Sequence, residues 1–222
     1  MGMDGKAEKD GQSYERDDFV ATTSNKQLNF LQHIKSVLKI GGSAAVVLPD
    51  NVLFEGGAGE TVRRTLLHDC DVHTILRLLT GIFYAQGVKA NVLFLERKPA
   101  SETPWTKDIW FYDFRTNEHF TLKQNPLSLG ALQDFISCYI AKDIGARQET
   151  DRFKKFSYDQ LVSRDKANLD IFWLRDETLE DSDSLPAPEL LAADIVENLN
   201  AALEQFAEIY ESLNELELRK VQ

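Results

Sequence analysis

The sequence predicts an α/β fold: the C-terminal half of a doubly wound sheet, mixed because its last strand is antiparallel, followed by a helical C-terminal region. Three observations lead to this prediction. Apolar residues with helical spacing alternate with short, continuous apolar runs that are typical of buried strands. Two of these runs are joined by a connection too short for a helical crossover, so they should pair antiparallel. No glycine-rich turn directly after a strand precedes Ser43, although a complete doubly wound sheet binds nucleotides at such a turn near the start of the fold.

Composition places the chain among globular proteins. Its 222 residues are 43% hydrophobic and 10% aromatic, which is enough to build a core. No apolar run approaches the ~20 residues of a membrane helix, and the amino-terminal segment has no apolar signal core. The two cysteines, Cys70 and Cys138, fit a reducing compartment better than a disulfide framework. We therefore expect a soluble, cytoplasmic protein without a membrane partner.

The net charge of −11 is concentrated in one segment of the chain. Residues 176–222 contain 13 acidic and 2 basic residues, whereas residues 1–175 contain 23 of each. Contact with a phosphate depends on a few local Lys and Arg residues rather than on the net charge. The acidic balance therefore argues against DNA contact by the C-terminal segment and leaves such contact open for the rest.

Changes in composition divide the chain into four regions. Residues 1–19 contain almost no apolar side chains, so we expect a flexible lead-in. Residues 20–142 carry the helix and strand patterns of a partial α/β domain. Residues 143–186 are polar and rich in turns, and we interpret them as a linker and docking segment. Residues 187–222 have the apolar spacing of one long helix.

The first elements are a helix, a strand and a second helix. Ser24 and Gln27 have the spacing of a capping box, and the apolar residues that follow keep helical spacing up to Gly41. The run Ser43–Pro49 is small, β-branched and apolar on both faces, which predicts a buried parallel strand covered by helices. A loop with three glycines follows, and a short apolar stripe then predicts a helix over Thr61–His68.

Three strands and a third helix complete the partial domain. The runs Val72–Leu78 and Val88–Leu95 predict the antiparallel pair, because the loop between them is too short for a crossover. The aromatic run Asp108–Phe114 predicts a further strand, which could pair with residues 120–122 across a turn. Helical spacing returns over Leu129–Ile140 and predicts the third helix.

A long amphipathic helix is predicted at the C-terminus. From Pro188 onward, apolar residues recur in steps of three and four, which predicts a helix of about thirty residues with an acidic back. The apolar stripe contains Leu191, Ile195, Leu199, Leu203, Phe206, Tyr210 and Leu213. A stripe of this length is normally covered, either by a partner or by the chain's own body.

Three short motifs contain residue types that occur in active sites. The glycines of residues 56–60 could cradle an anion with backbone amides, but no Lys-Ser/Thr pair follows, and a structural turn is favoured. Residues 68–73 include His, Asp and Cys, but their spacing matches no zinc motif. Asn125 and Pro126 begin like an Asn-Pro-Pro-aromatic catalytic loop and continue with Leu127, so a turn before the third helix is favoured.

The loop between the two antiparallel strands is the strongest candidate site. Phe83, Tyr84, Gln86 and Lys89 combine aromatic faces, an amide and a cation at a strand junction. Such residues suit a base extruded from a nucleic acid, because an aromatic ring stacks on the base and a lysine contacts the flanking phosphate. The alternative is that Phe83 and Tyr84 are core aromatics at a turn.

Four segments closely resemble the modification (methyltransferase) subunit of type I restriction-modification systems, a family of adenine-specific DNA methylases. They are ATTSNKQLNFLQHIKSVLK, AAVVLPDNVLFEGGAGETVRRTLL, HTILRLLTGIFYAQGVKANVLFLERKPAS and SRDKANLDIFWLRD, and the resemblance covers residues 15–215. It implies a Rossmann-like methyltransferase sheet whose fifth, sixth and antiparallel seventh strands lie at 43–49, 72–78 and 88–95. The family's cofactor loop, ribose-binding acid and Asn-Pro-Pro-aromatic loop match nothing here, so we expect the chain to begin after them.

The resemblance implies transfer of a methyl group from S-adenosylmethionine to the exocyclic amino group of an extruded adenine in DNA. The cofactor belongs to the intact subunit, and for this chain alone we expect no cofactor, no metal and no catalytic residue. Phe83 looks like the aromatic residue that packs against the adenine, and Lys89 like a phosphate contact. Leu79 replaces the family's usual proline, which could loosen the loop. The implied partners are DNA, a specificity subunit, a second modification subunit and a nuclease-translocase subunit.

The long C-terminal helix resembles the region through which these subunits associate with the specificity subunit. Two functional hypotheses follow. In the first, the chain is part of an adenine-specific DNA methyltransferase and is inactive alone. In the second, it is a non-catalytic interaction module that docks its apolar stripe on the specificity subunit or another protein.

Overall fold

The computed structural model of the chain describes residues 6–9, 12–80, 82–83, 88–115, 120, 126–140, 143–174, 196 and 203. The chain divides into two compact units, Met1–Asp176 and Glu177–Gln222. In the second unit, Val196 and Leu203 are helical, and 55% and 68% of their surfaces are exposed. Among the described residues, no helix is both long enough and apolar enough to cross a membrane. The other residues of the predicted long helix lie outside the described part.

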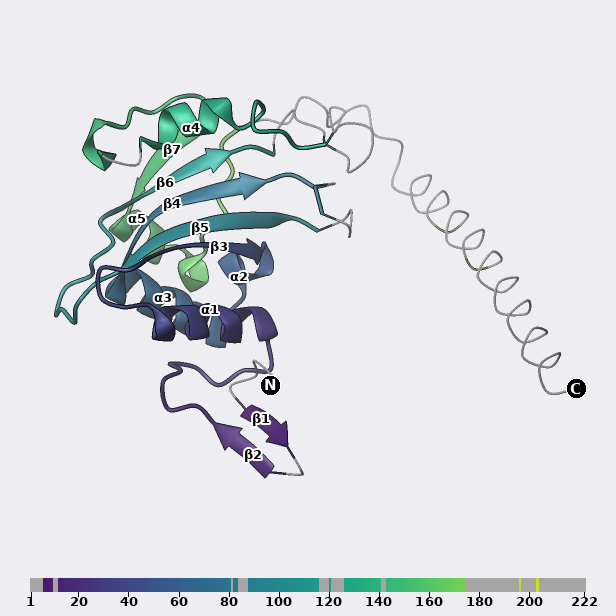
Figure 1. The fold of residues 1–222 in the computed structure, drawn as a ribbon, viewed down its shortest axis with the longest axis vertical. Coiled ribbons are helices and arrows are strands. Elements are labelled where there is room, and N and C mark those ends of the chain that lie inside the picture. The colour runs from purple at the N-terminus through teal and green to yellow at the C-terminus, as the bar shows by residue number, and fades with distance from the viewer. Residues whose placement is uncertain are drawn as a thin grey trace, which may run out of the picture. The chain divides into compact units, whose positions relative to one another are not determined.

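A five-stranded sheet forms the centre of the first unit (Figure 1). In spatial order, its strands are β3 (Ser43–Pro49), β5 (Ala90–Arg97), β4 (Cys70–Leu78), β6 (Asp108–Asp113) and β7 (Phe153–Ser157). β5 is antiparallel to both of its neighbours, β4 and β6 are parallel, and β7 is antiparallel to β6. β3, β4 and β6 therefore run in one direction. The mixed α/β sheet and the antiparallel pairing of β4 with β5 are confirmed.

β3 is an edge strand, and the prediction that it is buried on both faces is wrong. It pairs with β5, which is inserted between β3 and β4. Along β3, Val46 and Leu48 are buried, whereas Val47 is 55% exposed. The apolar character of the run suggested two covered faces, but only the face toward α1 and α3 is packed. In the described part of the chain no strand pairs with the other edge of β3.

Helices cover the two faces of the sheet unequally (Figure 1). One face carries α1 (Lys26–Val37), α2 (Asn51–Phe54), α3 (Ala58–Asp69) and α5 (Tyr158–Val162), and the other carries α4 (Gln133–Tyr139). Two short 3-10 turns complete the elements, at Ile144–Ala146 and Asp165–Ala167. The helices predicted at 61–68 and 129–140 are present, with different ends, and α2 and α5 were not predicted.

α1 begins one residue later than the capping-box pattern predicted. Asn25, not Ser24, is the N-cap, and its side chain accepts hydrogen bonds from the backbone N–H groups of Gln27 at 2.9 Å and Leu28 at 3.2 Å. Both residue types are favourable N-caps, so composition alone does not separate them. The helix ends at Val37, before the glycines that were expected to stop it.

Two apolar clusters hold the layers together, one on each face of the sheet. The larger lies between the sheet and α1, α2 and α3, and it includes Leu28, Leu31, Leu53, Leu67, Val72, Ile75, Leu93, Leu95, Ile109 and Phe111. The smaller cluster lies against α4 and is rich in aromatic residues; it includes Leu76, Leu78, Trp110, Tyr112, Phe135 and Phe153. The Tyr112 hydroxyl also donates a hydrogen bond to Asp134 in the first turn of α4, at 2.6 Å.

β7 lies in the segment 143–186, which was predicted to be a linker and docking segment. It pairs with β6 and occupies the position considered for residues 120–122. Phe153 stacks on Trp110 with ring centroids 4.7 Å apart, and Phe156 meets Phe111 edge-on at 5.5 Å. Since these two phenylalanines belong to opposite faces, β7 contributes to both apolar clusters.

Part of the predicted flexible lead-in has regular structure. β1 (Lys6–Lys9) and β2 (Gln12–Glu15) form a two-stranded antiparallel sheet. Polar residues dominate both strands, so the apolar pattern that identifies buried strands is absent from this segment.

A buried arginine connects α3 to the last described segment of the first unit. Arg63 is 2% exposed, and its guanidinium donates hydrogen bonds of 2.7–3.1 Å to the carbonyl oxygens of Val52, Glu55, Lys166 and Ala167. Burial lowers the pKa of Arg63 to about 10, so the side chain stays charged at neutral pH. These bonds fix the turn from which the chain returns to the sheet.

Candidate functional site

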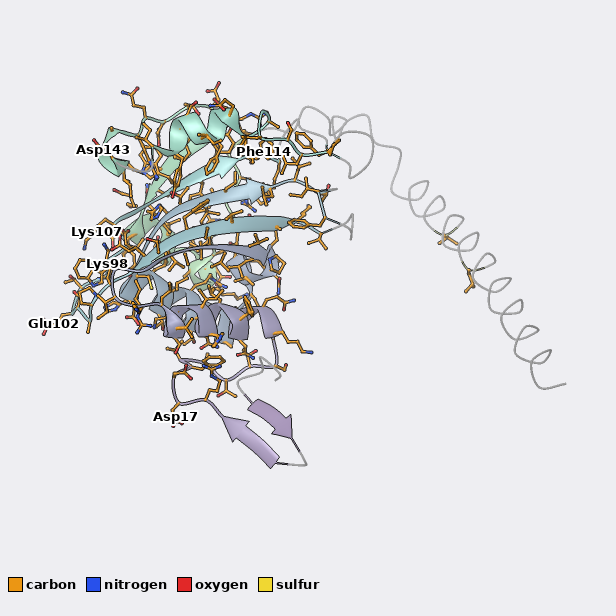
Figure 2. The ribbon with its side chains drawn as sticks, in the orientation of Figure 1. Asp17, Lys98, Glu102, Lys107, Phe114 and Asp143 are labelled. Atoms are coloured by element: carbon orange, nitrogen blue, oxygen red, sulfur yellow. The ribbon has the colours of Figure 1, made fainter. Side chains whose placement is uncertain are left out.

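The carboxyl ends of β3, β4 and β6 lie at one end of the sheet, which we call the carboxyl end. Open α/β sheets bind their ligands there, because the loops that follow the strands converge at this position. In Figure 2, Phe114 marks the carboxyl end directly after β6, and Lys107 marks the opposite end directly before β6. Because β5 is antiparallel to β4, the loop that joins them also lies at the carboxyl end.

A row of polar residues crosses three strands at the carboxyl end. Arg77 on β4 is in register with Asn91 on β5 and with Asp113 on β6. All three residues are buried, with exposures of 0%, 0% and 1%. Burial of charged and amide groups costs free energy unless partners satisfy them, so such a row inside apolar strands needs compensating contacts.

Arg77 is the centre of these contacts. Its Nη1 atom donates a hydrogen bond to the Ile171 carbonyl oxygen at 2.6 Å, and its Nη2 atom donates to the Asp170 carboxylate. The same Nη2 atom lies 3.9 Å from Oδ1 of Asp50, the residue that directly follows β3. Asn91 donates to this Asp50 oxygen at 2.6 Å. Arg77 therefore links β4 to the end of β3 and to the segment around Asp170.

A second guanidinium lies beside the first. The Nη1 atom of Arg115 is 3.6 Å from Asp50 and 3.9 Å from Asp170, and its Nη2 atom is 3.9 Å from Asp113. Burial lowers the pKa of Arg115, and the positive charge of Arg77 lowers it further. We call the residues Asp50, Arg77, Asn91, Asp113, Arg115 and Asp170 the Arg77 cluster. It combines two guanidiniums with three carboxylates.

The segment 168–173 closes over the Arg77 cluster. The backbone N–H of Leu169 donates to the Leu53 carbonyl oxygen at 2.9 Å, and Leu169 and Ile171 are buried in the larger core. Phe172, which directly follows Ile171, is 66% exposed. Its ring lies over both guanidiniums, with its centroid 4.9 Å from Cζ of Arg77 and 4.5 Å from Cζ of Arg115.

The residues predicted for base contact lie in the loop after β4. Phe83 is half-buried and packs against the smaller cluster, and Lys89 is exposed just before β5. The Lys89 carbonyl oxygen accepts a hydrogen bond from the Asp50 backbone at 3.1 Å, so the end of this loop is tied to the Arg77 cluster. Leu79 is 4% exposed. Tyr84 and Gln86 lie outside the described residues.

The weaker motifs fit structural explanations. Gly57 has a φ of +59° at the N-cap position of α3, which favours glycine there and supports a turn. Burial raises the pKa of Cys70 to about 11 and lowers that of His73 to about 4, so both are neutral at pH 7. No group of three or more potential metal ligands occurs among the residues that the structure describes. Asn125 lies outside them.

The Arg77 cluster was not predicted from the sequence. The available signal was a polar residue within each apolar run, at Arg77, Asn91 and Asp113. Their proximity depends on the register of three strands, and Asp170 is distant in the sequence. The resemblance included the segment around Asp170 but gave no role for it.

An antiparallel strand between two strands of the same direction, with a polar cluster at their carboxyl ends, defines the C-terminal half of a methyltransferase-type α/β sheet. A comparison with protein families agrees with this class. The family described as N-6 DNA Methylase matches residues 3–177, which is most of the chain. The protein belongs to this family.

Two methylase subunits illustrate the relationship. The chain is 44% identical over 217 residues to the type I restriction enzyme StySJI methylase subunit of Salmonella typhimurium, and 42% identical over 219 residues to the EcoKI methylase subunit of Escherichia coli. These matches cover 83% and 84% of this chain but 41% of each relative. The chain thus spans less than half the length of the relatives that it matches.

Solved structures support the same family. The crystal structure of the EcoKI M protein matches 84% of this chain and 44% of that protein, with a TM-score of 0.67 and 41% sequence identity. A structure described as showing complex assembly and conformational transition of the type I restriction-modification system matches 96% of this chain, with a TM-score of 0.61 and 25% identity.

The Arg77→Met variant should loosen the segment 168–173. Truncation of the guanidinium removes the fully buried partner of Asp50 and Asp170 and leaves them only Arg115, at 3.6 and 3.9 Å; breaking a buried pair costs up to about 5 kcal/mol of unfolding free energy. Hydrogen exchange should therefore become faster in this segment, and urea unfolding should show the loss of stability. The control is Arg64→Met, because Arg64 is 45% exposed and a surface ion pair contributes about 1 kcal/mol at most. Unchanged exchange in residues 168–173 would show that Arg77 does not hold them.

Proposed function

We propose that this chain is the C-terminal part of the catalytic subunit of a type I adenine-specific DNA methyltransferase. In this proposal the complete subunit transfers a methyl group from S-adenosylmethionine to the exocyclic amino group of an extruded adenine. The observation that carries the proposal is the match to the N-6 DNA Methylase family over residues 3–177, together with a carboxyl end that presents the loop after β4. The chain contributes the last strands of the catalytic sheet and its base-facing loop.

The edge of β3, which no described strand pairs with, supports a larger sheet. Unpaired edge strands are normally protected or paired, and the strand next to β3 would be supplied by another part of the subunit. Apolar side chains are also exposed near this edge: Val47 on β3 is 55% exposed, and Phe30 and Val37 on α1 are 47% and 63% exposed. These residues are suited to burial against the remaining part of the domain.

The cofactor is assigned to that remaining part. The sequence contains no Asn-Pro-Pro-aromatic loop and no glycine-rich turn directly after a strand. When bound, S-adenosylmethionine supplies the methyl group. Within this chain, the residues at the carboxyl end would orient the base.

The isolated chain should show no saturable binding of S-adenosylmethionine at micromolar concentrations in a calorimetric titration. The complete subunit, titrated in the same buffer, is the positive control. Saturable micromolar binding by the chain alone would contradict the assignment of the cofactor site to another part of the subunit.

Phe83 is proposed to stack on the extruded adenine, with Lys89 contacting a neighbouring phosphate. In the complete methyltransferase that contains this chain, Phe83→Ala should lower the rate of methyl transfer about tenfold to a hundredfold, because base stacking on an aromatic ring contributes ~1–3 kcal/mol. Transfer of tritiated methyl groups to duplex DNA measures this rate.

Two comparisons separate stacking from a role in the core. Phe83→Tyr should retain most of the activity because it keeps the aromatic face. Leu129→Ala removes an apolar side chain that is 73% exposed and should change nothing. A wild-type rate of methyl transfer in Phe83→Ala would show that Phe83 packs in the core and does not stack on the base.

Association through the C-terminal helix is the second candidate function. It is favoured by the exposure of Val196 and Leu203, two apolar residues that are helical in the second unit. We propose that the apolar stripe from Leu191 to Leu213 docks on the specificity subunit, and that a second modification subunit and a nuclease-translocase subunit join the same assembly.

The double variant Leu203→Asp and Phe206→Asp should abolish capture of the specificity subunit in a pull-down, because two charges would be buried in an apolar interface. Glu204→Gln, which lies outside the apolar pattern, is the matched control and should leave capture unchanged. Undiminished capture by the double variant would reject the stripe as the docking surface.

A further inference from the structure

Phe172 is an exposed aromatic residue in a segment that is otherwise firmly attached. Its ring lies over the guanidiniums of Arg77 and Arg115, while 66% of the residue remains exposed. Its neighbour Ile171 is 4% exposed, and Leu169 is 3% exposed. Since the adjacent residues supply the anchoring, burial of Phe172 is not needed to hold the segment in place.

The segment fixes the ring before any ligand binds. Before Phe172 in the sequence, Arg77 donates hydrogen bonds to the Asp170 carboxylate and the Ile171 carbonyl oxygen. After Phe172, the indole N–H of Trp173 donates to the Asp151 carbonyl oxygen at 2.7 Å. A side chain that is already ordered loses less conformational entropy on binding, so its contacts contribute more to affinity.

The charges of the Arg77 cluster indicate the kind of ligand. Arg77 and Arg115 are engaged by Asp50, Asp113 and Asp170, and the three carboxylates outnumber the two guanidiniums. The carboxylates already engage both guanidiniums, so these arginines are poorly suited to bind a phosphate. What the surface offers is the flat, uncharged face of the Phe172 ring.

The position of the ring relates it to the candidate base site. Arg77, on which Phe172 rests, is at the end of β4, and the loop that contains Phe83 begins directly after this strand. The end of the same loop is tied to the Arg77 cluster by the hydrogen bond from Asp50 to Lys89. Both aromatic residues therefore belong to the carboxyl end of the sheet.

We propose that Phe172 is a second base-contacting residue, on which a nucleobase of the DNA other than the methylated adenine stacks. This inference rests on the proposed function, since it assumes that DNA lies at the carboxyl end. Stacking on an aromatic ring suits any base, because every base has a π-face, so the contact supplies affinity and orientation without sequence readout. Phe172 thereby fixes the DNA strand beside the loop that receives the adenine.

The test uses the complete methyltransferase assembly that contains this chain, with Phe172→Ala, Phe172→Leu and Phe172→Trp. The Kd for duplex DNA should rise between about fivefold and 150-fold in the alanine and leucine variants, and the tryptophan variant should stay near wild type. Trp105→Ala is the control, because Trp105 is also an aromatic residue beside a cation, Lys98, but precedes β6 at the opposite end of the sheet. It should not change the Kd.

A set of DNA duplexes, each with one abasic site near the methylated adenine, distinguishes stacking from a structural role. When the abasic site replaces the base that stacks on Phe172, wild type and Phe172→Ala should bind the duplex with the same Kd, because the stacking base is already missing. A uniform loss of affinity for every duplex, or an unchanged Kd in both the alanine and the leucine variants, would overturn the proposal. Circular dichroism and thermal unfolding establish that the variants are folded.

Methyl transfer by the wild-type assembly is measured in parallel. If the wild type methylates adenine and Phe172→Ala binds DNA normally, the role of Phe172 is rejected while the proposed function stands. If the wild type transfers no methyl group to adenine, the proposed function itself fails.

Discussion

The buried guanidinium of Arg77 is the interaction on which the carboxyl end of this structure depends. An isolated charge with no exposure would be strongly unfavourable, and it is stabilised only because the Ile171 carbonyl oxygen, Asp170 and Asp50 surround it. Arg77 and these partners come from three separate parts of the chain. The partners' hydrogen bonds and ion pairs with this one guanidinium hold the end of β3, the end of β4 and the segment 168–173 together.

Insertion of β5 explains the rest of the architecture. Because β5 runs against β3 and β4, the loop after β4 returns to the carboxyl end and leaves Lys89 beside Asp50. Among the described strands, the same insertion places β3 at the edge, where its free backbone groups are available to a further strand. At the other edge, β7 uses Phe153 and Phe156 to close both apolar clusters. The unpaired edge of β3 and the polar carboxyl end are thus consequences of one strand order.

Local pattern predicted most of the elements and few of the contacts. The strands β4, β5 and β6 and the helices α1, α3 and α4 were recognisable from apolar periodicity. β7 was missed because Lys154 and Lys155 interrupt a strand of five residues. Its two phenylalanines pack into clusters on opposite faces of the sheet, which the sequence pattern alone does not show. The start of α1 was misplaced because Ser24 and Asn25 are both good caps, and tertiary contacts decide between them.

The candidate site was predictable only in part. The composition of the loop after β4 indicated Phe83 and Lys89, but the Arg77 cluster depends on strand register, which a single sequence does not reveal. Arg77 and Asp170 meet although 93 positions separate them. Polar residues inside apolar strands, such as Asn91 and Asp113, were the feature of the sequence that indicated a buried polar network.

Photo-crosslinking tests the central claim, that the carboxyl end of the sheet faces the methylated base, most directly. A duplex with 5-iodouracil in place of the target adenine is bound to the assembled methyltransferase and irradiated, and the crosslinked peptides are identified by mass spectrometry. The account predicts crosslinks within this chain to peptides that contain the loop after β4 or the segment 168–173. Crosslinks confined to peptides at the opposite end, such as the loop between β5 and β6, would contradict it.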